Sequence, residues 1–273
     1  MQDGVVRLLA DAGIRLSAGP RGYRPAISLP GFEVKILKPQ NIVEMLEAHS
    51  RDVGFAGADW VRELGSSAVE LLDTGLDPVR LVAAAPVALL EGGVLPRRPL
   101  VIASEYQRLT QDWIGLRALD ASFLRSYGAT EVFPPEDADL IVDNTATGAT
   151  LAANNLAIVD ELMASTTRLI AHPAALADPL RRGGIERLVM LCAAVLEARR
   201  RVMLEVNVSA DRLDAVCAVL PCMREPTIGQ LRGDAGYAVK AAVPRAEVAL
   251  VIPLIKAAGG CDIVVSELSQ IVP

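Results

Sequence analysis

The sequence predicts an α/β protein with two parts, a two-lobed core and a smaller C-terminal domain. Along the first 200 residues, short apolar segments alternate with segments of helical spacing, and the connections between them are short, which is typical of α/β folds. Beyond residue 200 the order becomes strand, helix, strand, strand, helix, strand, which is the ferredoxin-like βαββαβ pattern. The length of 273 residues suits two or three domains, and 52% hydrophobic residues exclude a disordered chain.

The first elements are predicted from apolar spacing and from residues that start or stop helices. Val5, Leu8 and Leu9 recur at helical spacing, and Gly13 ends that helix. Pro39 is a typical first residue of a helix. On this basis we expect helices at residues 2–12, 39–49 and 58–64, and strands at 32–37, 53–56, 69–72 and 79–85.

The middle of the chain continues this alternation, so largely parallel sheets are expected. The chain is predicted to cross between the lobes near Pro86 and to return near Asn155. Lobe I would hold residues 1–84 and 156–200, and lobe II residues 85–155. The expected strands are 100–103, 130–133, 140–142, 158–163 and 166–171, and the expected helices are 107–116, 121–127, one opening near 148, and 173–200.

The C-terminal domain is predicted to span residues 201–273. Its strands are expected at 202–208, 227–231, 237–243 and 262–267, and its helices at 210–220 and 245–258.

Charge and composition exclude several classes of function. A net charge of −6 and a pI near 5.1 argue against a nucleic-acid-binding protein. No apolar run approaches the length of about 20 residues that a membrane span needs, and no signal peptide is visible, so a cytoplasmic protein without a membrane partner is expected. Two histidines, His49 and His172, cannot form a His-rich metal site. The cysteines, which form no CxxC pair, are expected to be reduced core thiols: Cys192, Cys217, Cys222 and Cys261.

The strongest local signal is a strand, loop and helix at residues 139–151. A helix N-terminus offers unpaired N–H groups and the positive end of the helix dipole. The loop adds the hydroxyls of Thr145, Thr147 and Thr150, and Gly148 allows a ligand to approach the backbone. Asp143, at the strand end, could accept hydrogen bonds from a ribose diol. From these residues alone, a phosphate site and an ordinary capped turn remain open alternatives.

Residues 139–151, DLIVDNTATGATL, resemble the phosphoribosyl pyrophosphate (PRPP) loop of the ATP phosphoribosyltransferases. REPTI at residues 224–228 resembles the ESPTI motif of the long form of that family. The resemblance covers about residues 4–171 and extends into the C-terminal domain. Further segments that resemble family motifs are LKPQNI at 37–42, DVGFAGAD at 52–59, GATE at 128–131 and STTRLIA at 165–171.

This resemblance implies a pentosyltransferase whose two-lobed catalytic core is like that of periplasmic binding proteins. N1 of ATP would attack C1′ of PRPP and release pyrophosphate, which is the first step of histidine biosynthesis. Catalysis would depend on positioning, without an assigned catalytic side chain, and Mg²⁺ would be held mainly by PRPP. The residues assigned to PRPP are Asp143 for the ribose, and Thr145, Ala146, Thr147, Gly148, Ala149 and Thr150 for the 5′-phosphate.

Four residues in or beside the family motifs are further candidates for substrate contacts: Lys38, Asp59, Arg80 and Glu131. Their simpler alternatives stay open. These are a solvated side chain for Lys38 and Glu131, a helix cap for Asp59, and a surface ion pair for Arg80.

The long form implies feedback inhibition by histidine and a homo-oligomer between a dimer and a hexamer. Thr227 and Asn207 are expected to contact histidine, because Pro226 fixes the backbone before Thr227 and Asn207 ends the first strand of the C-terminal domain. The alternative is a domain that only holds subunits together.

Two segments depart from the family pattern. The family's opening strand, which ends in a Lys-Gly-Arg turn beside the substrate phosphates, has no counterpart before the helix expected at residues 2–12. We favour a start assigned too late as the explanation; the alternative function is a catalytically silent relative, or a regulatory or binding partner. Residues 133–138, FPPEDA, replace an apolar stretch of the family and are expected to affect only a loop.

Overall fold

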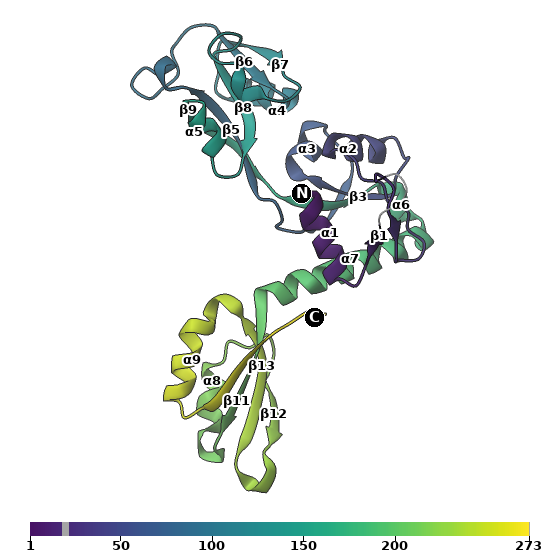
Figure 1. Cartoon of the computed structure of the whole chain (residues 1–273), viewed down its shortest axis with the longest axis vertical. Helices are drawn as coiled ribbons and strands as arrows, with labels where there is room; N and C mark the ends of the chain where they lie inside the picture. The colour runs from purple at the N-terminus through teal and green to yellow at the C-terminus, as the bar shows by residue number, and fades with distance from the viewer. Residues whose placement is uncertain (18–21, 273) are drawn as a thin grey trace. The chain divides into compact units, whose positions relative to one another are not determined.

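The computed structural model describes residues 1–17 and 22–272. Two compact units account for the chain, the first made of Met1–Val5 and Ser17–Glu186, and the second of Val6–Leu16 and Arg187–Pro273. Figure 1 labels most of the helices and strands, numbered in chain order. The chain opens with α1 (Gln2–Asp11), β1 (Leu16–Ser17) and β2 (Ala26–Ile27).

A five-stranded sheet with the order β7-β6-β8-β5-β9 forms one part of the first unit. β6 runs parallel to β7 and β8, whereas β5 runs antiparallel to β8 and β9. The loops that follow the parallel strands β6, β7 and β8 therefore meet at one edge of the sheet. The elements of this part are β5 (Val79–Pro86), β6 (Leu100–Ser104), α4 (Gln107–Leu116), β7 (Ala121–Arg125), β8 (Leu140–Thr145), α5 (Ala149–Ala153) and β9 (Leu156–Ser165).

A three-stranded antiparallel sheet with the order β3-β10-β4 forms the other part of the first unit. The chain leaves this sheet through β5 and comes back through β9 and β10 (Figure 1). The two sheets form a two-lobed core, but the expected lobe boundaries differ from the sheets. Residues 79–84 and 156–165, expected in lobe I, belong to the five-stranded sheet, because β5 pairs with β8 and β9 pairs with β5. The elements here are α2 (Pro39–Glu47), β3 (Val53–Gly57), α3 (Ala58–Glu63), β4 (Val69–Asp73), β10 (Thr167–Ala171) and α6 (Pro173–Ala177).

One cluster of buried side chains includes residues from both sheets of the first unit. Leu46 on α2 and Trp60 on α3 belong to the same cluster as Ile102 on β6, Leu140 on β8 and Tyr106 just before α4. The rings of Trp60 and Tyr106 are stacked, with centroids 4.5 Å apart. α3 is thereby held against the start of α4, at the edge where the parallel strands end.

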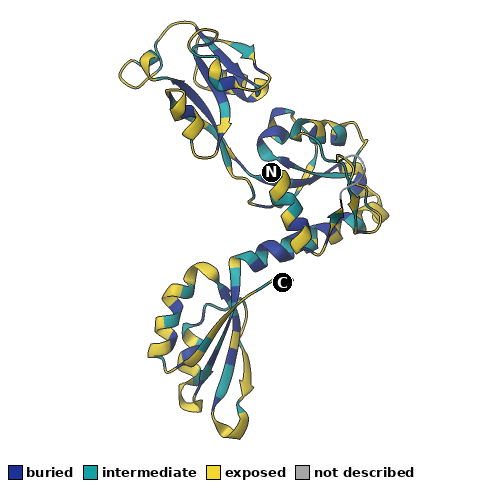
Figure 2. Cartoon of the chain, in the orientation of Figure 1, coloured by how far each residue is buried: buried dark blue, intermediate teal, exposed yellow. Residues whose placement is uncertain are grey.

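The second unit contains an antiparallel sheet with the order β12-β13-β11-β14. Alternate residues of β11, such as Leu204 and Val206, are buried with Val216 on α8 and Ile255 on α9. One face of the sheet therefore packs against the two helices (Figure 2). This arrangement confirms the predicted ferredoxin-like domain. The elements are α7 (Pro179–Arg200), β11 (Arg201–Val208), α8 (Leu213–Val219), β12 (Thr227–Gln230), β13 (Tyr237–Pro244), α9 (Val248–Ala257) and β14 (Cys261–Glu267).

Four predicted elements were wrong in type or extent. Residues 32–37 are not a strand, since they pair with no described strand. Residues 121–127, expected as a helix, contain β7, because parallel pairing with β6 outweighs the local spacing. Residues 130–133 form the 3₁₀ helix Thr130–Val132, which follows a turn at Ala129. Residues 173–200 form two helices, because Pro179 disfavours helical backbone at Asp178.

The expectation of largely parallel sheets was also wrong. Among the strands described, only β6–β7 and β6–β8 pair in parallel within these larger sheets. The alternation of strands and helices along the sequence does not reveal strand direction. β5 and β9 run between the two sheets and pair antiparallel to each other, so they are not joined as a parallel pair by a crossover helix. Cys192 is buried and Cys217 and Cys222 are half-buried, but Cys261 is exposed, contrary to the prediction.

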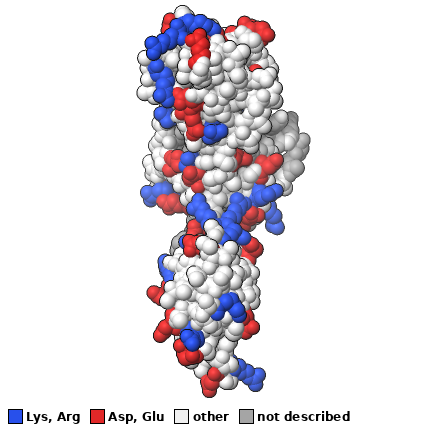
Figure 3. Space-filling model, turned by 90° about the vertical axis from the view of Figure 1, so that its left-hand side faces the viewer, with Lys and Arg blue, Asp and Glu red and all other residues white. Residues whose placement is uncertain are grey.

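Acidic and basic side chains both occur along the face drawn in Figure 3. In the described part of the chain, no helix combines the length and the apolar character needed to cross a membrane.

Candidate active site

The loop between β8 and α5 is held in a tight curve by its own threonines. Thr145 Oγ1 accepts a hydrogen bond from the Gly148 N–H at 2.9 Å, and Thr147 Oγ1 accepts one from the Ala149 N–H at 3.3 Å. Gly148 has a φ of 80°, a backbone conformation that favours glycine. Thr147, Ala149 and Thr150 are exposed and Gly148 is half-buried, so a ligand can reach this part of the loop.

Asp143 lies on β8, half-buried, close to two further carboxyl groups. Burial is the main cause that raises its pKa to about 6, and the charges of Glu105 and Glu131 raise it further. The Asn144 N–H donates to Asp143 Oδ1 at 2.7 Å and, with the Thr130 hydroxyl, opposes that shift. Asp143 is therefore ionised at neutral pH and is able to accept hydrogen bonds from hydroxyl groups.

A hydrogen-bonded network connects this edge of the sheet with α3. The buried carboxylate of Asp59 accepts hydrogen bonds from the Ser165 hydroxyl and from the Tyr106 phenol, both at 2.7 Å. The Tyr106 oxygen accepts in turn from the Asn144 side-chain amide at 2.8 Å. Burial, followed by the charge of Asp59, raises the pKa of Tyr106, so its phenol stays protonated and donates to Asp59.

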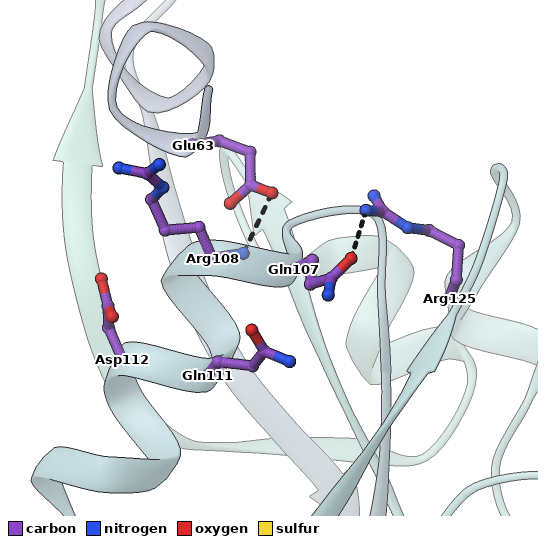
Figure 4. Close-up of a pocket in the computed structure, with 6 residues that line it drawn as sticks. All are labelled: Glu63, Gln107, Arg108, Gln111, Asp112 and Arg125. Carbon is purple, nitrogen blue, oxygen red and sulfur yellow. Dashed lines mark hydrogen bonds between the residues drawn. The ribbon is translucent and has the colours of Figure 1, made fainter. Parts of the chain in front are cut away.

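A polar cavity of about 260 Å³ lies where α3, α4 and β7 meet (Figure 4). The Glu63 carboxylate accepts the backbone N–H groups of Arg108 and Leu109, at 3.1 and 3.0 Å. Arg125 donates to Gln107 Oε1 at 2.9 Å across the same cavity. Glu63 therefore occupies two of the N–H groups that the first turn of α4 leaves without a partner in the helix.

Two family models match the chain and together span most of it. The model described as ATP phosphoribosyltransferase matches residues 38–193, and the model described as HisG, C-terminal domain, matches residues 198–270. The chain belongs to the ATP phosphoribosyltransferase family. This membership confirms the resemblance to the long form, and with it the prediction of a pentosyltransferase enzyme.

Curated ATP phosphoribosyltransferases are similar over the full chain. Those of Pelotomaculum thermopropionicum and Desulforudis audaxviator are 35% and 34% identical over 278 residues, covering 100% of this chain and 96% of each relative. A solved structure described as the ATP phosphoribosyl transferase (HisG:HisZ) complex from Thermotoga maritima has a TM-score of 0.63 at 23% identity. It covers 72% of this chain and 93% of that chain, and it supports the same mixed α/β fold.

Three other residues suggested by the family motifs lie on three different elements. Arg80 is paired across β5 and β8 with Thr145, and its guanidinium meets Glu161 at 3.2 Å. Glu131 lies in the 3₁₀ helix after β7, and its charge raises the pKa of Asp143. Lys38 is at the start of α2. Substrate contacts for these residues stay predictions.

The two residues expected to bind histidine lie on the same sheet face of the second unit. Thr227 on β12 is opposite Lys240 on β13, which is opposite Glu205 on β11. Asn207, two residues beyond Glu205, shares the sheet face that carries no helix. The Asn207 side chain donates to Asp262 at 3.1 Å.

The family motifs indicate the loop and Asp59 as candidate site residues. They do not indicate the parts that Tyr106, Asn144 and Glu63 play in the hydrogen bonds described above. Ser165 lay in a recognised motif without a role. One signal was available for α3: Asp59 and Glu63 are four residues apart, so both carboxylates share one face of that helix.

Proposed function

We propose that this chain transfers the phosphoribosyl group of PRPP to N1 of ATP, with release of pyrophosphate, as the first step of histidine biosynthesis. The observation that carries the proposal is the loop beside Asp143, in which Thr145 is buried and residues 146–150 are open to a ligand, at the edge where β6, β7 and β8 end. Membership of the ATP phosphoribosyltransferase family supports it.

The loop would bind the 5′-phosphate of PRPP, and Asp143 would bind its ribose. The hydroxyls and backbone N–H groups of Thr147 and Thr150 are donors for phosphate oxygens. At Gly148 the space where a side chain would begin is open, with Ile158 Cδ1 as the nearest atom at 3.9 Å. The ionised Asp143 would accept hydrogen bonds from both ribose hydroxyls. Hydrogen bonds to charged groups contribute about 1.5–3 kcal/mol each.

The transfer needs little general-base catalysis, because adenine N1 carries a free lone pair. The bond from N1 to C1′ forms while the bond from C1′ to the pyrophosphate oxygen breaks, and pyrophosphate leaves with that electron pair. The rate would depend on alignment of the two substrates and on stabilisation of the departing charge. Arg80 and Lys38 are the cations that we assign to the phosphate groups.

Mg²⁺ would enter as a complex with PRPP. This ion prefers oxygen ligands and keeps several of its waters. The phosphates of PRPP supply ligands of that type, so the substrate itself would hold most of the ion's coordination shell. Within residues 1–17 and 22–272, no group of three or more His, Cys, Asp or Glu side chains is placed to hold a metal ion.

We also propose that histidine inhibits the enzyme through the C-terminal domain, in a homo-oligomer between a dimer and a hexamer. Thr227 is exposed on the edge strand β12, and the sheet face that it shares with Asn207 carries no helix, so no helix of this domain covers either residue. The full chain with Thr227→Ala should lose most histidine inhibition while keeping its uninhibited rate. Inhibition equal to that of the wild type would contradict this assignment.

Calorimetric titration with PRPP in the presence of Mg²⁺ tests the loop. Thr147→Ala combined with Gly148→Val should weaken binding at least tenfold, because one donor is lost and a β-branched side chain is placed at a φ of 80°. Gly115→Ala is the matched control, since Gly115 lies in α4 with open space around it and an ordinary φ. Unchanged PRPP affinity in the double variant would remove the loop from the site.

A further inference from the structure

α3 presents two buried carboxylates to the start of α4. Asp59 and Glu63 are 4% and 7% exposed, and their spacing of four residues places them on one side of the helix. Glu63 accepts the N–H groups of Arg108 and Leu109, and Asp59 accepts the phenol of Tyr106. This joint, defined by Asp59, Glu63 and the first turn of α4, connects the two sheets of the first unit. Figure 4 shows its contact between Glu63 and Arg108.

Tyr106 is the point where the joint reaches β8. Its hydroxyl donates to Asp59 and accepts from the side chain of Asn144, the residue that follows Asp143. The ring is fully buried and stacked on Trp60, so it has little freedom to move. A rigid side chain thus links a carboxylate on α3 to the strand that carries the proposed ribose ligand.

The Asp59 carboxylate has a second donor in Ser165, at the end of β9. The Ser165 hydroxyl donates to Asp59 Oδ1 and accepts the backbone N–H of Asp59 at 3.1 Å. β9 is the strand that returns the chain toward β10. Four elements, α3, the start of α4, β8 and β9, therefore meet in one hydrogen-bonded network around this carboxylate.

We propose that the Tyr106 hydroxyl is a positioning group for the phosphoribosyl transfer, which sets the end of β8 relative to α3. The inference rests on the proposed function, because it assumes that PRPP lies against Asp143. Through Asn144, the hydroxyl fixes the strand beside Asp143, while the β8–α5 loop holds the 5′-phosphate independently. Loss of the hydroxyl therefore affects alignment of the substrates more than PRPP affinity. Misplacement by about 1 Å can cost 100-fold in rate.

Tyr106→Phe is the primary variant, because it keeps the stacked ring and removes only the hydroxyl. The full chain with this change should bind PRPP with a Kd within about threefold of the wild type, and its kcat should fall about 10- to 100-fold. Thr110→Val is the matched control: it removes another fully buried hydroxyl near the start of α4, and this hydroxyl has no hydrogen-bond partner among the described residues. The control should keep the wild-type kcat.

Asn144→Ala removes the other end of the link at an exposed position, so it is expected to fold. If Tyr106 acts through Asn144, each single variant should lower kcat, and the double variant should be no slower than the slower single variant. A destabilised fold alone would instead give losses that add and would lower PRPP affinity as well. Thermal unfolding of each variant checks this point.

The outcomes separate the inference from the proposed function. A wild-type chain that neither binds PRPP nor releases pyrophosphate overturns both. A wild-type chain that turns over, with Tyr106→Phe at an equal rate, overturns the positioning role alone. Additive losses in the double variant, or a loss of PRPP affinity that accounts for the slower rate of Tyr106→Phe, overturn it too. A lower kcat at constant affinity, without additivity, is the result that supports it.

Discussion

Asp143→Asn tests the proposed ribose contact through its dependence on pH. Burial is the main reason that the pKa of Asp143 rises from 3.8 to about 6. The carboxyl group accepts hydrogen bonds from both ribose hydroxyls only when it is ionised. Below a pH of about 6, Asp143 carries a proton that it must lose before it can bind the ribose. Protonation of Asp143 should therefore raise the Kd for PRPP about tenfold for each pH unit below 6.

The assay is a calorimetric titration of PRPP into the full chain between about pH 5 and pH 8, with the Asp143→Asn variant measured in parallel. The variant cannot ionise at this position, and it keeps only the pH dependence of the substrate phosphate, whose second pKa is about 6. The ratio of Kd values, variant over wild type, therefore isolates Asp143. This ratio should be largest above about pH 7 and about tenfold smaller near pH 5. A ratio that stays constant with pH would refute the ribose contact.

The same ionisation changes folding stability with a defined sign. Between pH 3.8 and about 6 the folded chain binds more protons at Asp143 than the unfolded chain does. The free energy of unfolding therefore falls as pH rises through this window, and the penalty is complete above it. A shift of about 2 pKa units corresponds to ~3 kcal/mol. Asp143→Asn should accordingly unfold at a higher temperature than the wild type near pH 7, and at a similar temperature at about pH 3.5.

Glu63→Ala should lower the free energy of unfolding by about 1–3 kcal/mol, measured by denaturant titration, because two N–H groups of α4 lose their acceptor; an unchanged midpoint would contradict this. Gly148→Ala should weaken PRPP binding more than Gly148→Asn, because asparagine tolerates the φ of 80° better. A calorimetric Kd that is higher for Gly148→Asn than for Gly148→Ala would contradict the importance of this backbone conformation. Arg80→Gln should raise the KM for PRPP, whereas Glu161→Gln, which removes only its ion-pair partner, should not.

Local spacing predicted those elements whose ends carry a chemical signal. Pro39 marks the first residue of α2, and Gly57 closes β3 before α3. The βαββαβ order of the C-terminal domain was predicted because its apolar alternation is strong, as β11 shows. Residues 121–127 misled the prediction, because their burial depends on β6, a neighbour that is distant in sequence. Strand direction was missed for the same reason.

The loop of the candidate site was found because a glycine and several threonines follow a buried strand. The joint was not found, because hydrogen bonds between Asp59, Tyr106 and Asn144 join residues 38 to 47 positions apart. A buried carboxylate on an amphipathic helix looks like a solvated residue in the sequence. Its partners become visible only when α3 is packed against α4.

The most direct test of the central claim is the release of pyrophosphate by the full chain with ATP, PRPP and Mg²⁺. We expect release only when both substrates are present, together with one equivalent of a product in which the ribose is attached to N1 of the adenine. Asp143→Ala should lower the rate sharply, and Gly115→Ala should leave it unchanged. Pyrophosphate release without ATP, or no product with both substrates, would contradict the proposed function.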